Sequence, residues 1–222
     1  GRAYALLPTG VEFPIGLHLQ ADWLLVTNRQ DLMELEGDPW HREILQQVPR
    51  LLTAYVSWVC GRRSLDNGVI GRALSALPDL SATQKSHSSW VAEDEFKNSL
   101  ADGLSKLAFI PSLTEDGVVF VQPSQARLLP KPLRKLNKRE LRPWDLFGPG
   151  VACAELLGKR TLKCVRELDL LDELRPEELE RKWEDGAVGE WAELHGEERT
   201  KRLLTVVRAL TGLLDDRSWT DA

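Results

Sequence analysis

The chain has 222 residues, of which 42% are apolar and 28% are charged, and its formal net charge is −5. This length is enough to bury the core of one or two domains, and the composition is that of an ordinary soluble protein. The mild negative charge argues against bulk nucleic-acid binding as the main task, and no apolar run reaches the ~20 residues needed to cross a bilayer.

From the pattern of the first residues we expect no signal peptide. The only methionine is Met33, so we expect the chain to be a fragment of a longer protein. Cys60, Cys153 and Cys164 lie far apart, and the four histidines do not cluster. A structural zinc site needs paired ligands, so we expect reduced thiols, no metal and a cytoplasmic location.

A short strand and turn over residues 4–10 lead into a long predicted strand, residues 13–25. Its odd positions are all apolar: Phe13, Ile15, Leu17, Leu19, Ala21, Trp23 and Leu25. Alternation with period two is typical of a strand that places one face on a core.

A charged loop follows this strand and leads to a helix. The loop contains Thr27, Asn28, Arg29, Gln30 and Asp31. Asp38 and Pro39 predict the start of the helix, with the carboxylate as N-cap and proline in the first turn. Apolar residues then recur at steps of three and four, and Gly61 predicts the end.

Residues 13–31, together with Trp40 and the helix after it, resemble the segment that follows the nucleotide-binding domain in sacsin-like proteins. There, a strand ending in Ser/Thr-Asn/Ser-Arg precedes a similar helix. The middle domain of the heat-shock protein 90 family has a similar strand, loop and helix, with Ser-Arg-Glu where this chain has Asn28-Arg29-Gln30. The resemblance covers roughly residues 4–60 and, more weakly, residues 108–129.

In the heat-shock protein 90 family this arginine reaches the γ-phosphate of ATP in the neighbouring nucleotide domain. The resemblance therefore implies a middle, transducer-like module of a GHKL-type ATPase and chaperone, with Arg29 as the catalytic candidate. Thr27, Asn28, Arg29 and Gln30 are the implied nucleotide-contacting residues. Arginine suits this role because its charge is permanent and its planar fork matches phosphate oxygens. The alternative is a solvated loop arginine paired with Asp31 or Glu34.

The chain shows no nucleotide pocket of its own. Residues 66–71 read Asp-Asn-Gly-Val-Ile-Gly, similar to the Asp-x-Gly-x-Gly box of GHKL ATPases, but the second glycine is displaced by one residue. The box would also follow the arginine loop, whereas in the family it precedes that loop. We interpret the segment as a turn between helices, and no Gly-Lys-Ser/Thr loop occurs either. We therefore expect no cofactor in this fragment, with ATP and Mg only in a preceding domain.

Further along, a short helix over residues 73–77 is expected to stop at Pro78, and residues 90–107 are expected to be helical. Asp116-Gly117 between apolar runs predicts a hairpin. Pro123 is expected to open a single helical turn.

The basic run of residues 131–142 contains six lysines and arginines and one glutamate. It reads as a solvated linker with prolines or, alternatively, as a phosphate-binding segment. After it we expect short helices over residues 151–157, 162–171 and 177–183, and a longer one over residues 197–214. Trp183, Trp191 and Trp219 are interpreted as packing residues rather than a ligand cage.

The predicted fold class is α+β, with an α/β sandwich as its N-terminal part and an all-helical part after it. The expected domains are an α/β middle domain (1–130), a basic Pro/Gly linker (131–150) and a helical domain (151–222). Two functions remain open. The first is the ATPase module, which would pass nucleotide state to a protein client or partner and could form a homodimer. The second is a non-catalytic protein-interaction module.

Overall fold

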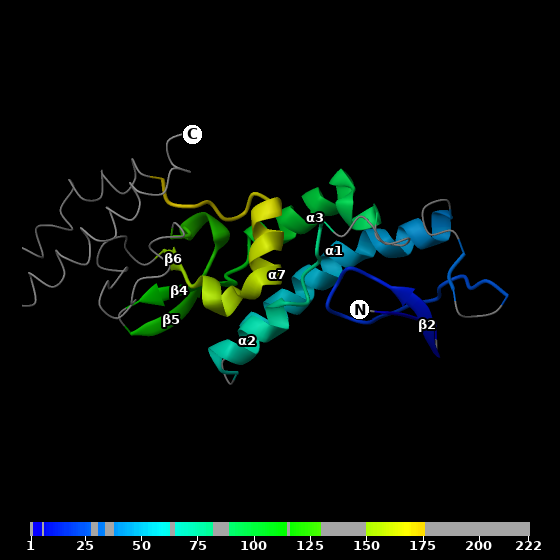
Figure 1. Ribbon diagram of the computed structural model, residues 1–222, viewed down its shortest axis with the longest axis horizontal. Coiled ribbons are helices and arrows are strands. Elements are labelled where there is room, and N and C mark those ends of the chain that lie inside the picture. Colours follow the sequence, from blue (N-terminus) through cyan, green and yellow to red (C-terminus); the bar gives the residue numbers. More distant parts are fainter. Residues whose placement is uncertain are drawn as a thin grey trace, which may run out of the picture.

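The computed structural model describes residues 2–5, 7–27, 31–33, 38–62, 65–81, 89–114, 116–129 and 150–175. These residues form helices and two small three-stranded sheets, which confirms the α+β class. The sheets lie toward opposite ends of the described part, with the helices between them (Figure 1). No helix among these residues is both long and apolar enough to cross a membrane.

The first sheet is built from the N-terminal residues. Its strands are β1 (Arg2–Ala5), β2 (Leu7–Glu12) and β3 (Leu19–Gln20), in the order β2-β1-β3. β1 pairs with β2 antiparallel and with β3 parallel, and Ala3 lies opposite Leu19.

The long strand expected over residues 13–25 is wrong, because only Leu19 and Gln20 pair as strand β3. The alternation nevertheless reports burial correctly: Phe13, Ile15, Leu19 and Trp23 are buried. Residues 14–17 form bends, so these side chains are buried by packing against other elements and not because a continuous strand alternates them. Here the backbone bonds to other elements, as where the Gly16 N–H donates to the Ala76 carbonyl at 2.9 Å.

The predicted central helix is confirmed as α1 (Pro39–Cys60). The Asp38 side chain accepts hydrogen bonds from the N–H groups of Trp40 and His41, and Gly61 is the C-cap. One face of α1 is buried: His41, Leu45, Val48, Pro49, Leu52, Val56 and Val59. Two later helices, α2 (Asn67–Leu74) and α3 (Asp94–Ser105), pack against α1.

Residues 66–71 form a helix start and not the expected turn. Asp66 is the N-cap of α2 (Asn67–Leu74), and its side chain accepts from the Val69 N–H at 2.8 Å. Gly68 lies in the first turn of α2, and Gly71 is buried near the middle of the helix. Of the helix predicted over residues 73–77, only Ala73 and Leu74 are helical, and they are the last two residues of α2.

The helix expected over residues 90–107 divides into a 3-10 turn η1 (Ser89–Ala92) and α3 (Asp94–Ser105). The hairpin is confirmed as β4 (Ile110–Thr114) and β5 (Gly117–Val121), with Thr114 opposite Gly117. The single helical turn is confirmed as η2 (Pro123–Gln125).

The segment expected to be helical from residue 151 begins as a strand. β6 (Val151–Ala152) pairs with β4, which completes the order β5-β4-β6, and α7 (Ala154–Glu167) follows. Gly158, with φ 70°, interrupts the helical backbone of α7. α7 packs against α2, and its buried Leu157 and Val165 belong to the same core as α1 and α3.

Several expectations lie outside the described residues. They concern the basic linker over residues 131–149, the helices over residues 177–183 and 197–214, and the three C-terminal tryptophans. For its described part, residues 151–175, the expected helical domain shares the core of the α/β part.

Candidate functional site

The base of the arginine loop, residues 27–31, is a pair of hydrogen-bonded backbone segments. Leu25 and Leu32 form an antiparallel bridge. The Val26 N–H donates to the Asp31 carbonyl at 3.1 Å, and the Met33 N–H donates to the Leu24 carbonyl at 2.9 Å. These bonds bring the two ends of the loop together.

The first turn of α1 holds the incoming side of this base. The Leu24 N–H donates to His41 Nε2 at 2.9 Å, and Trp40 Nε1 donates to the Asp22 carbonyl at 2.7 Å. Both donor–acceptor pairs depend on the helix start, because Asp38 caps the turn that carries Trp40 and His41. The loop base is thus fixed to a 22-residue helix.

Aromatic rings pack together in the core where the loop base meets the first turn of α1. The Trp23 ring lies 5.5 Å from that of Phe13 and 5.8 Å from that of His41. His41 is fully buried, its Nε2 accepts the hydrogen bond from the Leu24 N–H, and its buried Nδ1 has no hydrogen-bond partner in the described part of the chain. Sequence reasoning missed His41, since its partner is a backbone group that the expected strand would have paired within a sheet.

Of the predicted site residues, Thr27 is exposed in a turn at the edge of the loop base. Asn28, Arg29 and Gln30 lie outside the described residues, as does Glu34. The Asp31 carboxylate accepts a hydrogen bond from the N–H of Leu32 at 2.9 Å, at the point where the chain leaves the loop.

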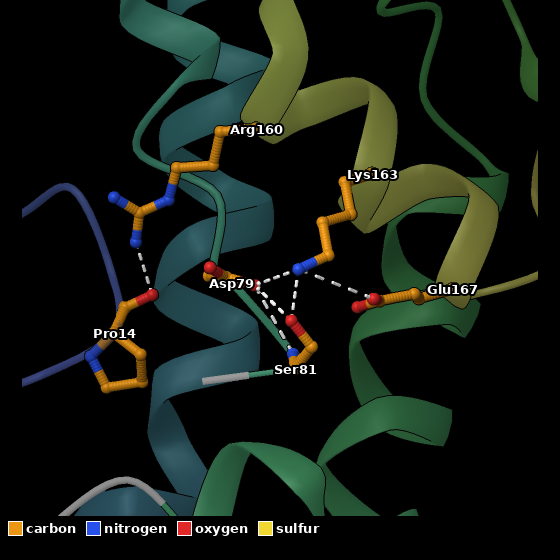
Figure 2. A network of polar contacts seen from close by, with 6 residues as sticks. All are labelled: Pro14, Asp79, Ser81, Arg160, Lys163 and Glu167. Atoms are coloured by element: carbon orange, nitrogen blue, oxygen red, sulfur yellow. Dashed lines mark hydrogen bonds and ion pairs between the residues drawn. The ribbon is translucent and has the colours of Figure 1, made fainter. Parts of the chain in front are cut away.

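A second polar cluster joins the segment after α2 to α7 (Figure 2). Lys163 Nζ lies 3.0 Å from Asp79 Oδ1 and also donates to Ser81 Oγ, which in turn donates to Asp79 at 2.9 Å. Arg160 donates to the Pro14 carbonyl and thereby ties α7 to the N-terminal segment. The bonds that Arg160 and Lys163 of α7 make to the earlier segments join residues 82 to 146 apart in sequence, so no local pattern could have predicted them.

Ser81 beside a lysine invites comparison with a nucleophile and its base, but the charges oppose that role. The hydrogen bond to Asp79 raises the pKa of Lys163, and the hydrogen bond from Lys163 lowers the pKa of Asp79. A lysine held in its protonated form cannot take the serine proton. We therefore assign this cluster a structural role in joining three segments.

The three cysteines are free thiols, as expected. Burial raises the pKa of Cys60 to about 11 and, together with the nearby Glu167 carboxylate, that of Cys164 to about 12. Both thiols are therefore protonated near neutral pH and poorly nucleophilic.

A hollow of about 80 Å³ lies between α1 and α3. Leu45, Pro49, Trp90 and Phe96 contribute to its wall. Small-molecule sites usually measure about 300–1,000 Å³, so we assign no nucleotide site to this hollow. Among the described residues, no three histidine, cysteine or acidic side chains converge on a possible metal position.

Comparison with protein-family models, with curated proteins and with solved structures found no match for this chain.

Proposed function

We propose that this chain is the middle, transducer-like module of an ATPase similar to sacsin and heat-shock protein 90. In this proposal Arg29 contributes a positive charge to the γ-phosphate of ATP in a nucleotide-binding domain of the same polypeptide. Thr27, Asn28 and Gln30 flank that contact. ATP and Mg²⁺ belong to the other domain, a protein client or partner receives the signal, and the protein works in the cytoplasm.

The observation that supports the proposal most is the anchoring of the loop base. An arginine that acts on a neighbouring domain must be presented by a rigid support, because a misplacement of about 1 Å can cost a large part of the rate. The bonds from Leu24 to His41 and from Trp40 to Asp22 supply such a support at the N-terminus of α1.

A non-catalytic protein-interaction module is the second candidate. Three large apolar side chains around the loop base are exposed: Leu24 by 39%, Met33 by 47% and Trp40 by 50%. Exposed apolar residues that gather in one place mark surfaces for protein contact. Leu24 and Met33 also fit the first proposal, in which they would contact the nucleotide-binding domain.

Replacement of Arg29 in the full-length protein distinguishes the two candidates. We expect Arg29→Ala to slow ATP hydrolysis by about a hundredfold or more and to leave ATP affinity nearly unchanged, because the contact forms in the transition state. Arg29→Lys should recover only part of the rate, since lysine retains the charge and lacks the fork.

Arg72→Ala is the matched control, since Arg72 is an exposed arginine in the last turn of α2. It should hydrolyse ATP at the parental rate. If folded Arg29→Ala does the same, the phosphate-sensing role is wrong and the interaction module becomes the better description. Calorimetric titration of the 222-residue chain with Mg-ATP should show no binding, because we place the nucleotide in another domain.

A further inference from the structure

Helix α1 carries a second apolar face beside the one that it buries. Along it lie Trp40, Ile44, Leu51, Tyr55 and Trp58, which we call the α1 stripe. Trp40, Leu51 and Trp58 are 50%, 52% and 55% exposed, and Ile44 and Tyr55 are half-buried.

The spacing of the stripe is that of a helix-packing seam. Its members follow one another at steps of four, seven, four and three residues, so they remain on one side of the helix. Single exposed apolar residues are common on proteins, but a row along a whole helix marks a surface that packs against another helix.

Charged residues at the two ends of the stripe differ in sign. Glu43 is exposed near the start, and the exposed Arg62 follows the end, where its guanidinium lies 4.6 Å from the centre of the Trp58 ring. The small, exposed Ala54 lies close to the middle. The stripe therefore has an acidic end, a basic end and a shallow centre.

We propose that the α1 stripe is a homodimer interface in which two copies of α1 pack antiparallel. A twofold axis at the level of Leu52 and Thr53, on the side of α1 that carries the stripe, places Glu43 opposite the partner's Arg62, Gln47 opposite the partner's Trp58, and Leu51 opposite the partner's Ala54. An isologous interface requires such self-complementarity. In the antiparallel arrangement the positive end of each helix dipole lies beside the negative end of the other, which is favourable. A parallel pair would instead bring two Arg62 side chains together.

Sedimentation equilibrium of the 222-residue chain tests the proposal. We expect a monomer–dimer equilibrium with a Kd of roughly 1–100 μM, typical of a small interface. Leu51→Lys should weaken the dimer by about thirtyfold or more, because it places a charge at the centre of the seam. Ser57→Lys adds the same charge at an exposed position of α1 outside the stripe and should leave the Kd unchanged.

Charge exchange tests the antiparallel register. Glu43→Arg and Arg62→Glu should each weaken the dimer by about threefold to tenfold, and the double variant should recover most of the loss. Circular dichroism of each variant checks that the fold is retained.

Three results would overturn the proposal. The first is a chain that stays monomeric up to about 0.5 mM, far above the Kd of a specific interface. The second is a dimer that Leu51→Lys does not weaken, or in which the double charge variant recovers nothing. The third is a monomer that binds neutral lipid vesicles through Trp58, which would assign the stripe to a membrane surface.

Discussion

At the scale of single residues, His41 links the central helix to the arginine loop. Its ring is fully buried, and its Nε2 accepts the Leu24 N–H at 2.9 Å. A backbone donor that loses its partner in a partly buried place costs free energy, typically about 1–3 kcal/mol when burial is complete. The bond therefore resists separation of the loop base from α1.

We expect His41→Phe to loosen the loop base, because phenylalanine fills the ring volume and offers no acceptor. Hydrogen exchange of the Leu24 amide should accelerate at least about fivefold, as follows from the loss of about 1 kcal/mol of hydrogen bonding. Hydrogen exchange followed by NMR measures this directly.

His41→Gln is the matched variant, since a glutamine oxygen can occupy the place of Nε2 and accept the same bond. Its Leu24 amide should exchange more slowly than in His41→Phe. Equal exchange in the two variants, or no change in either, would show that the histidine does not hold the loop base.

The residues at this junction also show what the sequence could and could not predict. Asp38 and Pro39 were predictable as a helix start, because capping acts within one turn. The partners of Trp40 and His41 were not, since these side chains bond to backbone groups 17 and 18 residues away. For the loop itself, Arg29 remains a prediction that rests on resemblance.

At the scale of elements, local signals predicted α1 and the hairpin well: the helical periodicity of apolar residues in the first case and Asp116-Gly117 in the second. Pairing between distant segments was not predicted. β6 contains two residues, Val151 and Ala152, and exists because β4 is there to pair with it. In residues 13–25 the alternation predicted the buried side correctly but not the hydrogen-bond partners. Those partners lie on the segment after α2, on β1 and on α1.

The contact between α2 and α7 depends on the absence of a side chain at Gly71. A Cβ atom there would lie 2.1 Å from the carbonyl oxygen of Leu156, far inside van der Waals contact with rigid backbone. We expect Gly71→Ala to lower the free energy of unfolding by about 1–3 kcal/mol, because α2 and α7 must move apart. Urea denaturation followed by circular dichroism measures the change.

Gly68→Ala in the same helix is the control. Its Cβ would lie 3.1 Å from Asp66 Oδ1, and this capping carboxylate would need to move by only a few tenths of an ångström. Alanine also gains about 0.5–1 kcal/mol over glycine within a helix, so this variant should be close to neutral. If Gly71→Ala is as stable as Gly68→Ala, the close contact of α2 with α7 is wrong.

At the scale of the whole molecule, the segments before and after residues 131–149 form one body. Backbone hydrogen bonds connect them: Arg127 donates to Gly150 at 2.7 Å, Ala152 donates to Arg127 at 2.9 Å, and Leu174 donates to Leu128 at 2.8 Å. The Ser112 hydroxyl of β4 also donates to the Val151 carbonyl of β6 at 3.0 Å. The basic run thus joins two parts of a shared core, whatever role its charges have.

This arrangement predicts the behaviour of the chain after cleavage. Trypsin should cut first within the basic run of residues 131–142, in which four of the six lysines and arginines are not followed by proline. The two pieces should then remain together, because β6 is paired with β4 and the Leu157 and Val165 side chains of α7 are fully buried. Dissociation of the two pieces would expose the apolar surface of Leu157 and Val165 to water. This exposure costs a free energy of about 25 cal/mol for each Å².

Size-exclusion chromatography of the cleaved protein, with mass spectrometry of the peak, measures this association. Under native conditions both pieces should elute together at the volume of the intact chain, and in about 6 M urea, which exposes the buried surface, they should separate. Separation without urea would mean that residues 150–175 do not belong to the core of the first part. Residues 13–23 contain no lysine or arginine, so chymotrypsin probes this segment in a parallel digest. First cleavage there would mean that the segment is less protected than its buried side chains indicate.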